Sequence, residues 1–545
     1  MLPESPEYVI ALLNSSAYSY EVTEIDLRET HISYVHIAGD YVFKTKKAVN
    51  FGFVNQMSLE SRKFFCDQEV VLNSRLAPSI YLGVVPVVRL NGGQIVVDPP
   101  PNESQGAETL EWAVKMRRLP EEATLASVLK TGGENVDTLA ERLAMRLFEF
   151  HKTCEEVEAD VEFAGPKKVK EWWGRELIEV ADFIDFTLPR ETYERLLTSV
   201  EKMLQVHESV LLQRLETGLV VEGHGDLHCD HVYLLDPFSE LASGRPDGIV
   251  IVDGIEFNDW FQFRYLDVGY ELAFLAMDMT ALGYESLANE LVGRYIIATG
   301  DQTLSVVQPL HRMFRAFIRG KIASITAQDS GLSKDARKKL EIEASSYFSL
   351  AVGYVPELSQ PMSVVMCGVS GSGKSLISAT LASKYGFAWL NSDAIRKEMF
   401  GVAVGEELSP SKYSDDISQQ VYEKMVEKAQ LFISYGQSVV LDATHLTHAQ
   451  RMNSMAIAIQ LGASSTLVAI DIDAELAEDR VVNRMNKVGN ISDATSNVLK
   501  KQLKQYQIPS ADELSNGIVI DANLQLAEQT ALISKHMESI HQSSE

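Results

Sequence analysis

The sequence contains few cysteines and no long apolar run, and both features exclude classes of protein. The four cysteines, Cys66, Cys154, Cys229 and Cys367, are far apart and form no CxxC pair, so neither a zinc-ribbon site nor a disulfide framework is predicted. No stretch of about 18 apolar residues is present that could span a bilayer, and residues 1–16 lack the basic leader and apolar core of a signal peptide. We therefore expect a cytoplasmic protein that does not enter a membrane.

Positive charge is also scarce, because 49 Lys and Arg residues stand against 76 Asp and Glu residues, which gives a formal net charge of −27. A surface this acidic repels polyanions, so the composition disfavours long nucleic acids and anionic membranes as partners. A small basic pocket for phosphate groups is still compatible with this charge. The oligomeric state leaves no signal in the sequence.

The pattern of the chain changes several times along its 545 residues. Short β-like runs over about 30–100 surround one helical stretch at 58–76, which predicts a small sheet with a helix. The segment 135–352 is mainly helical. After the proline-containing stretch 355–363, strands alternate with helices, which predicts a parallel sheet covered by helices on both faces.

These changes predict two domains. We expect an α+β bilobal domain over residues 1–352, with a small lobe at about 1–110 and a helical lobe at about 111–352. An α/β domain with a parallel sheet is expected over residues 353–545. Such a chain is long enough for several cores, and 46% of its residues are apolar.

The strongest motif is GVSGSGKS at 368–375, which fits GxxxxGK[ST] between a predicted strand and a predicted helix. Its glycines allow backbone N–H groups to approach phosphates closely, and the following helix N-terminus adds partial positive charge. Lys374 would neutralise the β and γ phosphates of ATP, and Ser375 would bind Mg²⁺. The predicted nucleotide-binding residues of this loop are Gly368, Ser370, Gly371, Ser372, Gly373, Lys374 and Ser375. The alternative is a merely flexible Gly/Ser loop.

Two acidic positions follow at the ends of predicted strands. Asp393 could accept the proton of an attacking hydroxyl, while Arg396, one helical turn on, could hold an anionic acceptor or the transferring phosphate. Alternatively, Asp393 or Ser392 only caps a helix. Asp442 is a candidate Mg²⁺ carboxylate, although a strand-terminal Asp is often a turn residue.

Arg480 and Arg484 lie at i and i+4 of a later helical pattern, on one face. They could close over the phosphates of the nucleotide as a lid. The alternative is an ordinary solvated helix face.

Together, these motifs over roughly 360–540 resemble the P-loop kinases that include gluconate kinases, zeta toxins and the kinase part of polynucleotide kinases. The resemblance implies transfer of the ATP γ-phosphate to a hydroxyl of a small molecule or of a nucleic-acid end.

A second polar cluster lies at VEGHGDLHCDH (221–231), and Asp253 follows about 27 residues after Asp226. One carboxylate that orients an acceptor hydroxyl and another that holds Mg²⁺ are what kinase chemistry needs. The same His and Asp residues are also compatible with a transition-metal site.

The His-Gly-Asp-x-His motif resembles the catalytic loop of aminoglycoside phosphotransferases and choline kinases. The resemblance implies that Asp226 is the catalytic base and Asp253 a metal ligand. It also implies that Lys44 binds phosphate and pairs with Glu69, although Lys46 and Lys47 compete for that role. Surface lysines on an edge strand are the alternative.

One position departs from that family, because His231 stands where an Asn usually helps to bind the metal. Neutral imidazole is a poorer Mg²⁺ ligand than an amide oxygen. If His231 holds the metal, the site binds Mg²⁺ weakly; otherwise Asp230 substitutes, or the domain binds nucleotide without turnover.

Nearly the whole chain resembles bacterial fusions of a phosphotransferase-like domain with a P-loop kinase domain. We therefore predict an ATP- and Mg²⁺-dependent phosphotransferase with a small-molecule hydroxyl acceptor, whose P-loop domain is catalytic. The first domain would be a second kinase site or a substrate-binding remnant. Two rival interpretations are a nucleotide-hydrolysing regulatory switch and a binding protein that contains a pseudokinase.

Overall fold

The computed structural model describes residues 5–51, 54–132, 138–155, 165–242, 244–257, 265–355, 360–484 and 491–542. By its internal contacts the chain forms two compact units. The first unit comprises Met1–Glu134, Phe150–Val157 and Val220–Leu266, and the second comprises Asn135–Glu149, Glu158–Leu219 and Asp267–Glu545. Most of the predicted helical lobe therefore packs in one unit with the C-terminal part, so the domain boundary near 352 remains a prediction. Residues 356–359 of the predicted linker lie outside the described residues.

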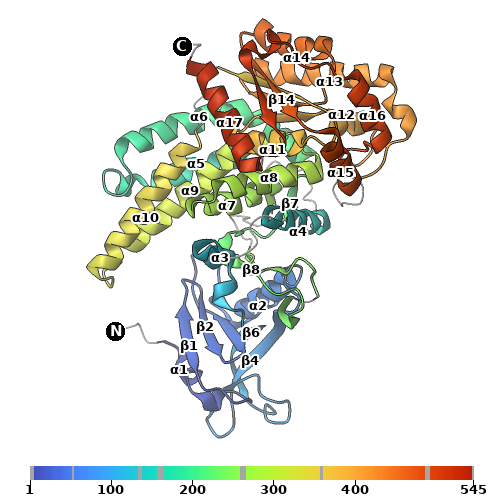
Figure 1. Cartoon of the computed structure of the whole chain (residues 1–545). Helices are drawn as coiled ribbons and strands as arrows, with labels where there is room; N and C mark the ends of the chain where they lie inside the picture. The colour runs from blue at the N-terminus through green and yellow to red at the C-terminus, as the bar shows by residue number, and fades with distance from the viewer. Residues whose placement is uncertain are drawn as a thin grey trace. The chain divides into compact units, whose positions relative to one another are not determined.

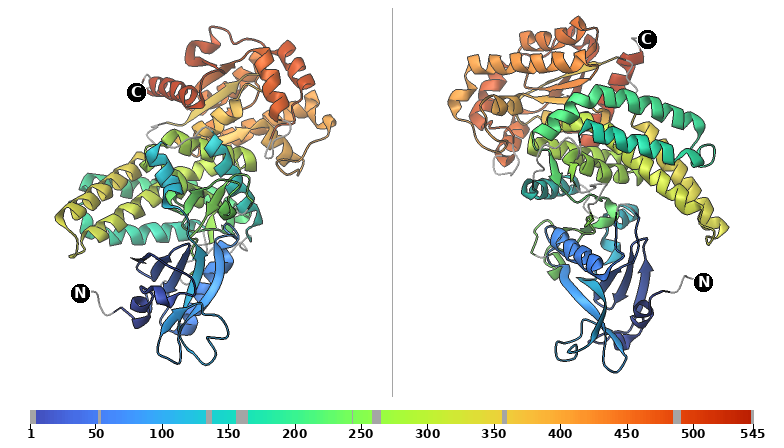
Figure 2. Two further views of the ribbon diagram at one scale, coloured as in Figure 1. Left: turned by 60° about the horizontal axis from the view of Figure 1, so that its bottom comes forward. Right: turned by 180° about the vertical axis from the view of Figure 1, so that it is seen from behind.

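The first unit is built on a six-stranded antiparallel sheet with the strand order β1-β2-β3-β6-β4-β5, coloured in blues in Figure 2. Its strands are β1 (Ile25–Glu29), β2 (Ser33–Ala38), β3 (Tyr41–Lys46), β4 (Tyr81–Arg89), β5 (Ile95–Val97) and β6 (Glu108–Arg117). Helix α2 (Leu59–Asn73) follows the N-cap residue Ser58, whose side chain accepts a hydrogen bond from the N–H of Ser61. It packs its buried face on β4 and β6, which confirms the predicted sheet with one helix.

A short hairpin brings the polar turns of the first unit together. Strand β8 (Val232–Leu234) pairs antiparallel with β9 (Ile249–Ile251), and Val232 lies opposite Ile251. The N–H of Val252 donates to the carbonyl of His231 at 3.0 Å. The residues just before β8 and just after β9 therefore meet at one end of the hairpin. The remaining elements of this unit are α1 (Glu7–Ala11), α3 (Leu125–Thr131) and β7 (Val220–Glu222), which pairs with β10 (Tyr265–Asp267) where the second unit begins.

The C-terminal part of the second unit contains a five-stranded parallel sheet with the order β12-β13-β11-β14-β15. Its strands are β11 (Met362–Cys367), β12 (Ala388–Asn391), β13 (Val439–Asp442), β14 (Ser464–Asp471) and β15 (Gly517–Asp521). The three central strands are almost wholly buried, as expected for a parallel sheet covered on both faces. The predicted fold class, an α+β kinase-like part followed by an α/β P-loop part, is confirmed.

Helices of both predicted domains belong mainly to the second unit (Figure 1). Those after residue 360 are α11 (Lys374–Tyr385), α12 (Ser392–Met399), α13 (Asp415–Ser434), α14 (His448–Gln460), α15 (Ala474–Arg484), α16 (Ser496–Gln505) and α17 (Leu526–Gln542). Those before it are α4 (Leu139–Thr153), whose last residues belong to the first unit, and α5 (Pro166–Glu179), α6 (Arg190–Glu216), α7 (Val268–Ala281), α8 (Glu285–Thr299), α9 (Leu304–Ala327) and α10 (Lys334–Gly353).

Helices α8 and α9 pack directly against α11, the helix that follows the P-loop. A Cβ atom at Gly293 would lie 2.9 Å from the backbone nitrogen of Thr380, so only glycine permits this approach. The buried Arg312 guanidinium donates to the Ser383 hydroxyl at 2.9 Å, and the Ser305 hydroxyl donates to the Phe387 carbonyl at 2.6 Å. The helical segment is therefore part of the core around the P-loop helix. Within the described residues, no helix is both long enough and apolar enough to cross a bilayer.

The contact at Gly293 yields a stability prediction. Gly293→Ala places a methyl group against the backbone of α11, which cannot move aside as a flexible side chain would. We expect a loss of about 1–3 kcal/mol in the free energy of unfolding, as in other overpacked cores. The matched control is Gly174→Ala in α5, where a Cβ atom meets nothing within 4 Å and alanine favours the helix by up to about 1 kcal/mol. Denaturant unfolding measures both; equal behaviour of the two variants would contradict the close packing of α8 on α11.

Candidate active site

The P-loop adopts a backbone path that requires glycine at two positions. Gly371 has a φ of 83°, and a Cβ atom there would lie 2.4 Å from the carbonyl oxygen of Ala477 in α15. Gly373, with a φ of 93°, is the N-cap residue of α11. The loop is held from outside as well, because the N–H of Ser370 donates to the Gln502 side chain at 2.8 Å. These constraints fix the loop in one shape and argue against a merely flexible Gly/Ser segment.

Three polar side chains, one from the P-loop and two from strand ends, meet at the end of the sheet. Because Met366 of β11 pairs with Asp442 of β13, the end of β13 lies beside the start of the P-loop. The Asp442 carboxylate accepts hydrogen bonds from the Ser375 hydroxyl and, at 2.6 Å, from the Asn391 amide. Burial raises the pKa of Asp442, an effect that the nearby Lys374 ammonium and these hydrogen bonds reduce without cancelling it. Ser375 and Asp442 are thus placed as a hydroxyl and a carboxylate that could hold a Mg²⁺ ion.

The Lys374 ammonium group is buried and lies against the loop itself. Its Nζ atom donates to the carbonyl of Val369 at 3.0 Å and lies 3.4 Å from the hydroxyl of Ser372. Lys374 also lines the cavity described below. A lysine in this position can exchange a loop carbonyl for a phosphate oxygen through a change of rotamer.

Asp393 does not cap helix α12, so the alternative that it serves only as a helix cap is wrong. The N-cap residue is Asn391, whose side-chain oxygen accepts from the N–H groups of Asp393 and Ala394, both at 2.9 Å. The Asp393 side chain lies in the first turn of the helix and lines the cavity. Asn391 therefore has two roles: its side-chain oxygen caps α12, and its amide group donates to the Asp442 carboxylate.

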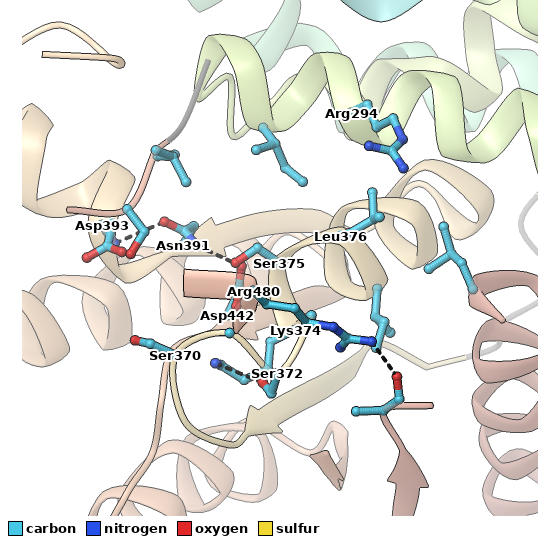
Figure 3. A pocket seen from close by; sticks show the side chains of 18 of the residues that line it. Arg294, Ser370, Ser372, Lys374, Ser375, Leu376, Asn391, Asp393, Asp442 and Arg480 are labelled. Carbon is cyan, nitrogen blue, oxygen red and sulfur yellow. Dashed lines mark hydrogen bonds between the residues drawn. The ribbon is translucent and has the colours of Figure 1, made fainter. Parts of the chain in front are cut away.

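A cavity of about 540 Å³ brings these groups together. The P-loop from Ser370 to Ser375, Asp393 and Asp442 line one part of it, and Arg480 lines another, where it donates to the carbonyl of Ala522 at 2.9 Å. Across the cavity, Arg294 reaches from α8 (Figure 3). Its guanidinium pairs with Glu141 of α4 at 3.0 Å and with Glu290 at 2.7 Å.

Of the other two predicted arginines, Arg396 does not line this cavity, and the side chain of Arg484 is not described. The Arg396 guanidinium lies 4.7 Å from the centre of the Tyr413 ring and donates to the carbonyl of Lys412 at 3.1 Å. It is buried, and it is not among the residues that line the cavity. Arg484 ends helix α15, and its side chain lies outside the described residues.

His445 holds the ends of two central strands together behind the site. It is fully buried with a φ of 41°, and its ring nitrogens lie 2.7 Å from the Met366 carbonyl and 2.9 Å from the Ser454 hydroxyl. A neutral imidazole satisfies both partners by donating to the carbonyl and accepting from the hydroxyl. Burial lowers the pKa of His445 to about 4.

The first unit holds a separate cluster around Lys44. Its ammonium group lies 2.9 Å from a Glu69 oxygen, as expected, and also 2.8 Å from an oxygen of Asp253, which the sequence predicts as a metal ligand. Lys46 is wholly buried between Glu69 and Glu256, whereas Lys47 pairs with the exposed Glu29. Of the three lysines, Lys44 is thus the one in contact with Asp253.

The charges of this cluster keep its carboxylates ionised. Burial opposes ionisation of Asp253, but Lys44 and then His231 outweigh it, and its pKa lies below the ordinary value. Burial likewise opposes ionisation of Glu69, which Lys44 and Lys46 overcome. His231 lies 4.0 Å from Asp253 and 3.7 Å from Asp226, and burial lowers its pKa. Asp226, Asp253 and His231 therefore converge, as the sequence predicts.

Comparisons with known proteins bear on both parts of the chain. Residues 364–509 match the family model of the AAA domain, which confirms a P-loop domain at this place. Over 483 residues the chain is 28% identical to an uncharacterized protein of Mycobacterium tuberculosis (strain ATCC 25618 / H37Rv), which covers 87% of this chain and 88% of that protein. An uncharacterized protein of Mycobacterium bovis (strain ATCC BAA-935 / AF2122/97) matches to the same extent. Both matches extend over the two parts of this chain.

Two solved structures are similar to parts of the chain. A gluconokinase from Sinorhizobium meliloti 1021 covers 34% of this chain and 95% of its own, with 21% identity and a TM-score of 0.26. A choline/ethanolamine kinase family protein from Mesorhizobium loti covers 61% of this chain and 92% of its own, with 13% identity and a TM-score of 0.33.

Sequence reasoning missed several residues of the cavity. Asn391 lies two residues before Asp393. Its position between a predicted strand and a predicted helix is typical of a capping residue. Arg294 and Glu141 had no such signal, because they lie on helices more than 70 residues before the P-loop and face it only through tertiary packing.

The buried histidines of the second unit predict a loss of stability in acid. The folded-state pKa values of His445, His207 and His311 are each about 4, below the ordinary value of 6.5. The unfolded chain therefore binds these protons first as the pH falls from about 6.5 to about 4, and stability is lost over that window. For His445 alone the loss is on the order of 3 kcal/mol.

We expect His445→Gln to flatten the slope of unfolding free energy against pH between 6.5 and 4, even though the variant is less stable at pH 7. Urea unfolding at several pH values measures both slopes. Parallel slopes for wild type and variant would show that His445 does not titrate in this way.

Proposed function

We propose that this protein is an ATP- and Mg²⁺-dependent phosphotransferase that moves the γ-phosphate of ATP to a hydroxyl group of a small molecule at the P-loop cavity. The observation that carries the proposal is the convergence of Lys374, Ser375, Asp442 and Asp393 on one cavity. This set offers a cation for phosphate, a hydroxyl and a carboxylate for a metal, and a second carboxylate for the acceptor.

The phosphate-binding half of the proposal rests on the loop and its helix. Backbone N–H groups of the P-loop and the N-terminus of α11 would bind the phosphates, and Lys374 would neutralise their charge. Mg²⁺ would be held by Ser375 and Asp442 and would offset the negative charge that develops on the phosphate oxygens. The hydrogen bond from Asn391 holds the Asp442 carboxylate in place for this task.

The acceptor half rests on Asp393. Its carboxylate lies in the first turn of α12 without a capping role, so it is available to accept the proton of an attacking hydroxyl. Arg396, one turn further on, is held against Tyr413 outside the cavity. We propose that it shapes the acceptor side by fixing Tyr413, and that it contacts an anionic acceptor only after this stacking is broken.

The far wall of the cavity supports a small acceptor. Arg294, Glu141, Met145 and Ile297 come from α4 and α8 and close the space opposite the P-loop. Two carboxylates already balance the Arg294 charge, so the polar part of this wall offers both donors and acceptors for a neutral hydroxyl group, beside the apolar Met145 and Ile297. A cavity of about 540 Å³ is in the range of sites for small molecules. The acidic chain disfavours long nucleic acids.

The first unit is proposed not to carry this transfer. Its Lys44, Glu69, Asp226 and Asp253 would form a second kinase-like site or a substrate-binding remnant, as the resemblance implies. Because these residues belong to a different compact unit from the P-loop, transfer at the P-loop should not need them.

The test is the formation of phosphorylated products from ATP and a metabolite extract, followed by mass spectrometry. Lys374→Ala removes a preorganised positive charge, and we expect product formation to fall by roughly 100- to 1,000-fold. The matched control is Lys384→Ala at the other end of α11, which does not line the cavity. Asp226→Ala should retain the product. ATP hydrolysis without any phosphorylated product would overturn the kinase proposal in favour of a hydrolysing switch.

Asp393→Asn separates acceptor activation from nucleotide binding. If Asp393 is the base, the variant should lower kcat by about 100- to 10,000-fold. Affinity for ATP should stay within about twofold, because the phosphate-binding groups are intact. Asp335→Asn on α10, an exposed carboxylate away from the cavity lining, serves as the control. An unchanged kcat in Asp393→Asn would remove this residue from the mechanism.

A further inference from the structure

We propose that the first unit binds a divalent transition-metal ion of the zinc class through Asp226, His228 and His231. Each of these residues offers one ligand atom, and the three atoms lie within 4.8 Å of one another. The inference does not depend on the activity proposed for the P-loop cavity, because all three residues belong to the other compact unit.

The distances are close to those of a bound ion. The Asp226 Oδ2 atom lies 3.7 Å from Nε2 of His228 and 3.7 Å from Nδ1 of His231. Ligands at about 2.0–2.1 Å from a tetrahedral zinc ion are roughly 3.3 Å apart, so a shift of a few tenths of an ångström brings each imidazole nitrogen into place relative to the carboxylate. The two imidazole rings lie with their centroids 3.9 Å apart, beside one carboxylate.

The backbone fixes these side chains before any ion binds. His228, Cys229, Asp230 and His231 form a tight 3₁₀ turn in front of β8, and the carbonyl of His231 accepts from Val252 across the hairpin. The imidazoles of His228 and His231 are largely buried, with 10% and 18% of their side-chain surface exposed, whereas Asp226 is 38% exposed. The three side chains are therefore brought together before an ion binds, and the Asp226 side of the cluster is the most exposed.

Each imidazole also has a carboxylate near its second nitrogen. Nδ1 of His228 lies 3.6 Å from Asp230 Oδ2, and Nε2 of His231 lies 4.0 Å from Asp253 Oδ2. Histidines that bind metals usually donate their other N–H to such an outer carboxylate. Without metal, the geometry favours the opposite tautomers, because Nδ1 of His231 lies 2.9 Å from the Asp226 carbonyl and Nδ1 of His228 accepts from the N–H of Asp230 at 3.3 Å. Binding would therefore replace two hydrogen bonds: Nδ1 of His231 would leave the Asp226 carbonyl for the ion, and Nδ1 of His228 would give up the Asp230 N–H and donate to the Asp230 carboxylate. Each ring would keep one proton.

The donor set selects the class of metal. Two imidazoles and one carboxylate suit zinc and related transition metals, whereas Mg²⁺ prefers oxygen ligands and water. Lys44 engages Asp253 at 2.8 Å, which leaves that carboxylate as an outer partner of His231. With its Oδ2 atom on a metal, Asp226 would be a weaker base for the proton of a hydroxyl, which favours a metal-binding part over a second kinase site in the first unit.

Zinc titration of the full-length protein tests the proposal. The protein is treated with a chelator, dialysed and titrated calorimetrically with Zn²⁺ in excess Mg²⁺ and without nucleotide. We expect one Zn²⁺ per chain, with affinity reduced by at least about 100-fold in His228→Asn and His231→Asn and by roughly 10- to 100-fold in Asp230→Asn. His31→Asn, an exposed histidine of the same unit, should bind as wild type does. Unchanged Zn²⁺ affinity in His228→Asn and His231→Asn would overturn the proposal, as would the absence of stoichiometric binding to the wild type.

A second measurement needs no variant and so does not depend on how the substitutions affect folding. Co²⁺ bound in a four- or five-coordinate protein site absorbs visible light more strongly than hydrated, octahedral Co²⁺. We expect one equivalent of Co²⁺ to give such a spectrum with the wild-type protein and one equivalent of Zn²⁺ to bleach it. A spectrum of hydrated Co²⁺ alone would count against the site.

Discussion

The P-loop helix α11 can lie where it does only because α8 carries a glycine at the point of contact. At Gly293 even a methyl group would meet the backbone of Thr380. The next residue along α8, Arg294, then faces the cavity, and Ile297 and Ala298 follow one turn later. The approach of two helices that are about 80 residues apart in the sequence therefore determines the shape and chemistry of the cavity wall. Helix α8 therefore forms part of the cavity wall, as the P-loop does.

The electrostatics of the cavity differ from those of the chain. The protein carries a formal net charge of −27, yet Lys374, Arg480 and Arg294 all line one small space. Asp442 and Asp393 add negative charge where a metal ion and an acceptor hydroxyl would bind, and Glu141 balances Arg294. An acidic surface around such a cavity would disfavour large polyanions while small phosphate-bearing ligands can still enter.

The sequence predicted the site residues that follow strand ends. It did not predict those whose position depends on packing between distant segments. The P-loop, Asp393 and Asp442 follow strand ends, and parallel strands bring such positions to one edge of a sheet, so their convergence could be expected. Arg396 has the right spacing for an acceptor site, but its contact with Tyr413 turns it elsewhere. Among three neighbouring lysines the sequence could not decide, whereas burial and ion pairs single out Lys44 as the partner of Asp253. Arg294 could not be found, because only tertiary structure joins α8 to α11.

Hydrogen–deuterium exchange of the full-length protein, with and without Mg²⁺ and ATP, tests whether α4 and α8 form one nucleotide site with the P-loop. We expect ATP to slow exchange in the P-loop and α11 and also in α8 around residues 290–298 and in α4 around residues 139–145. Slower exchange that is confined to the P-loop and its own α/β part, with α4 and α8 unchanged, would contradict it.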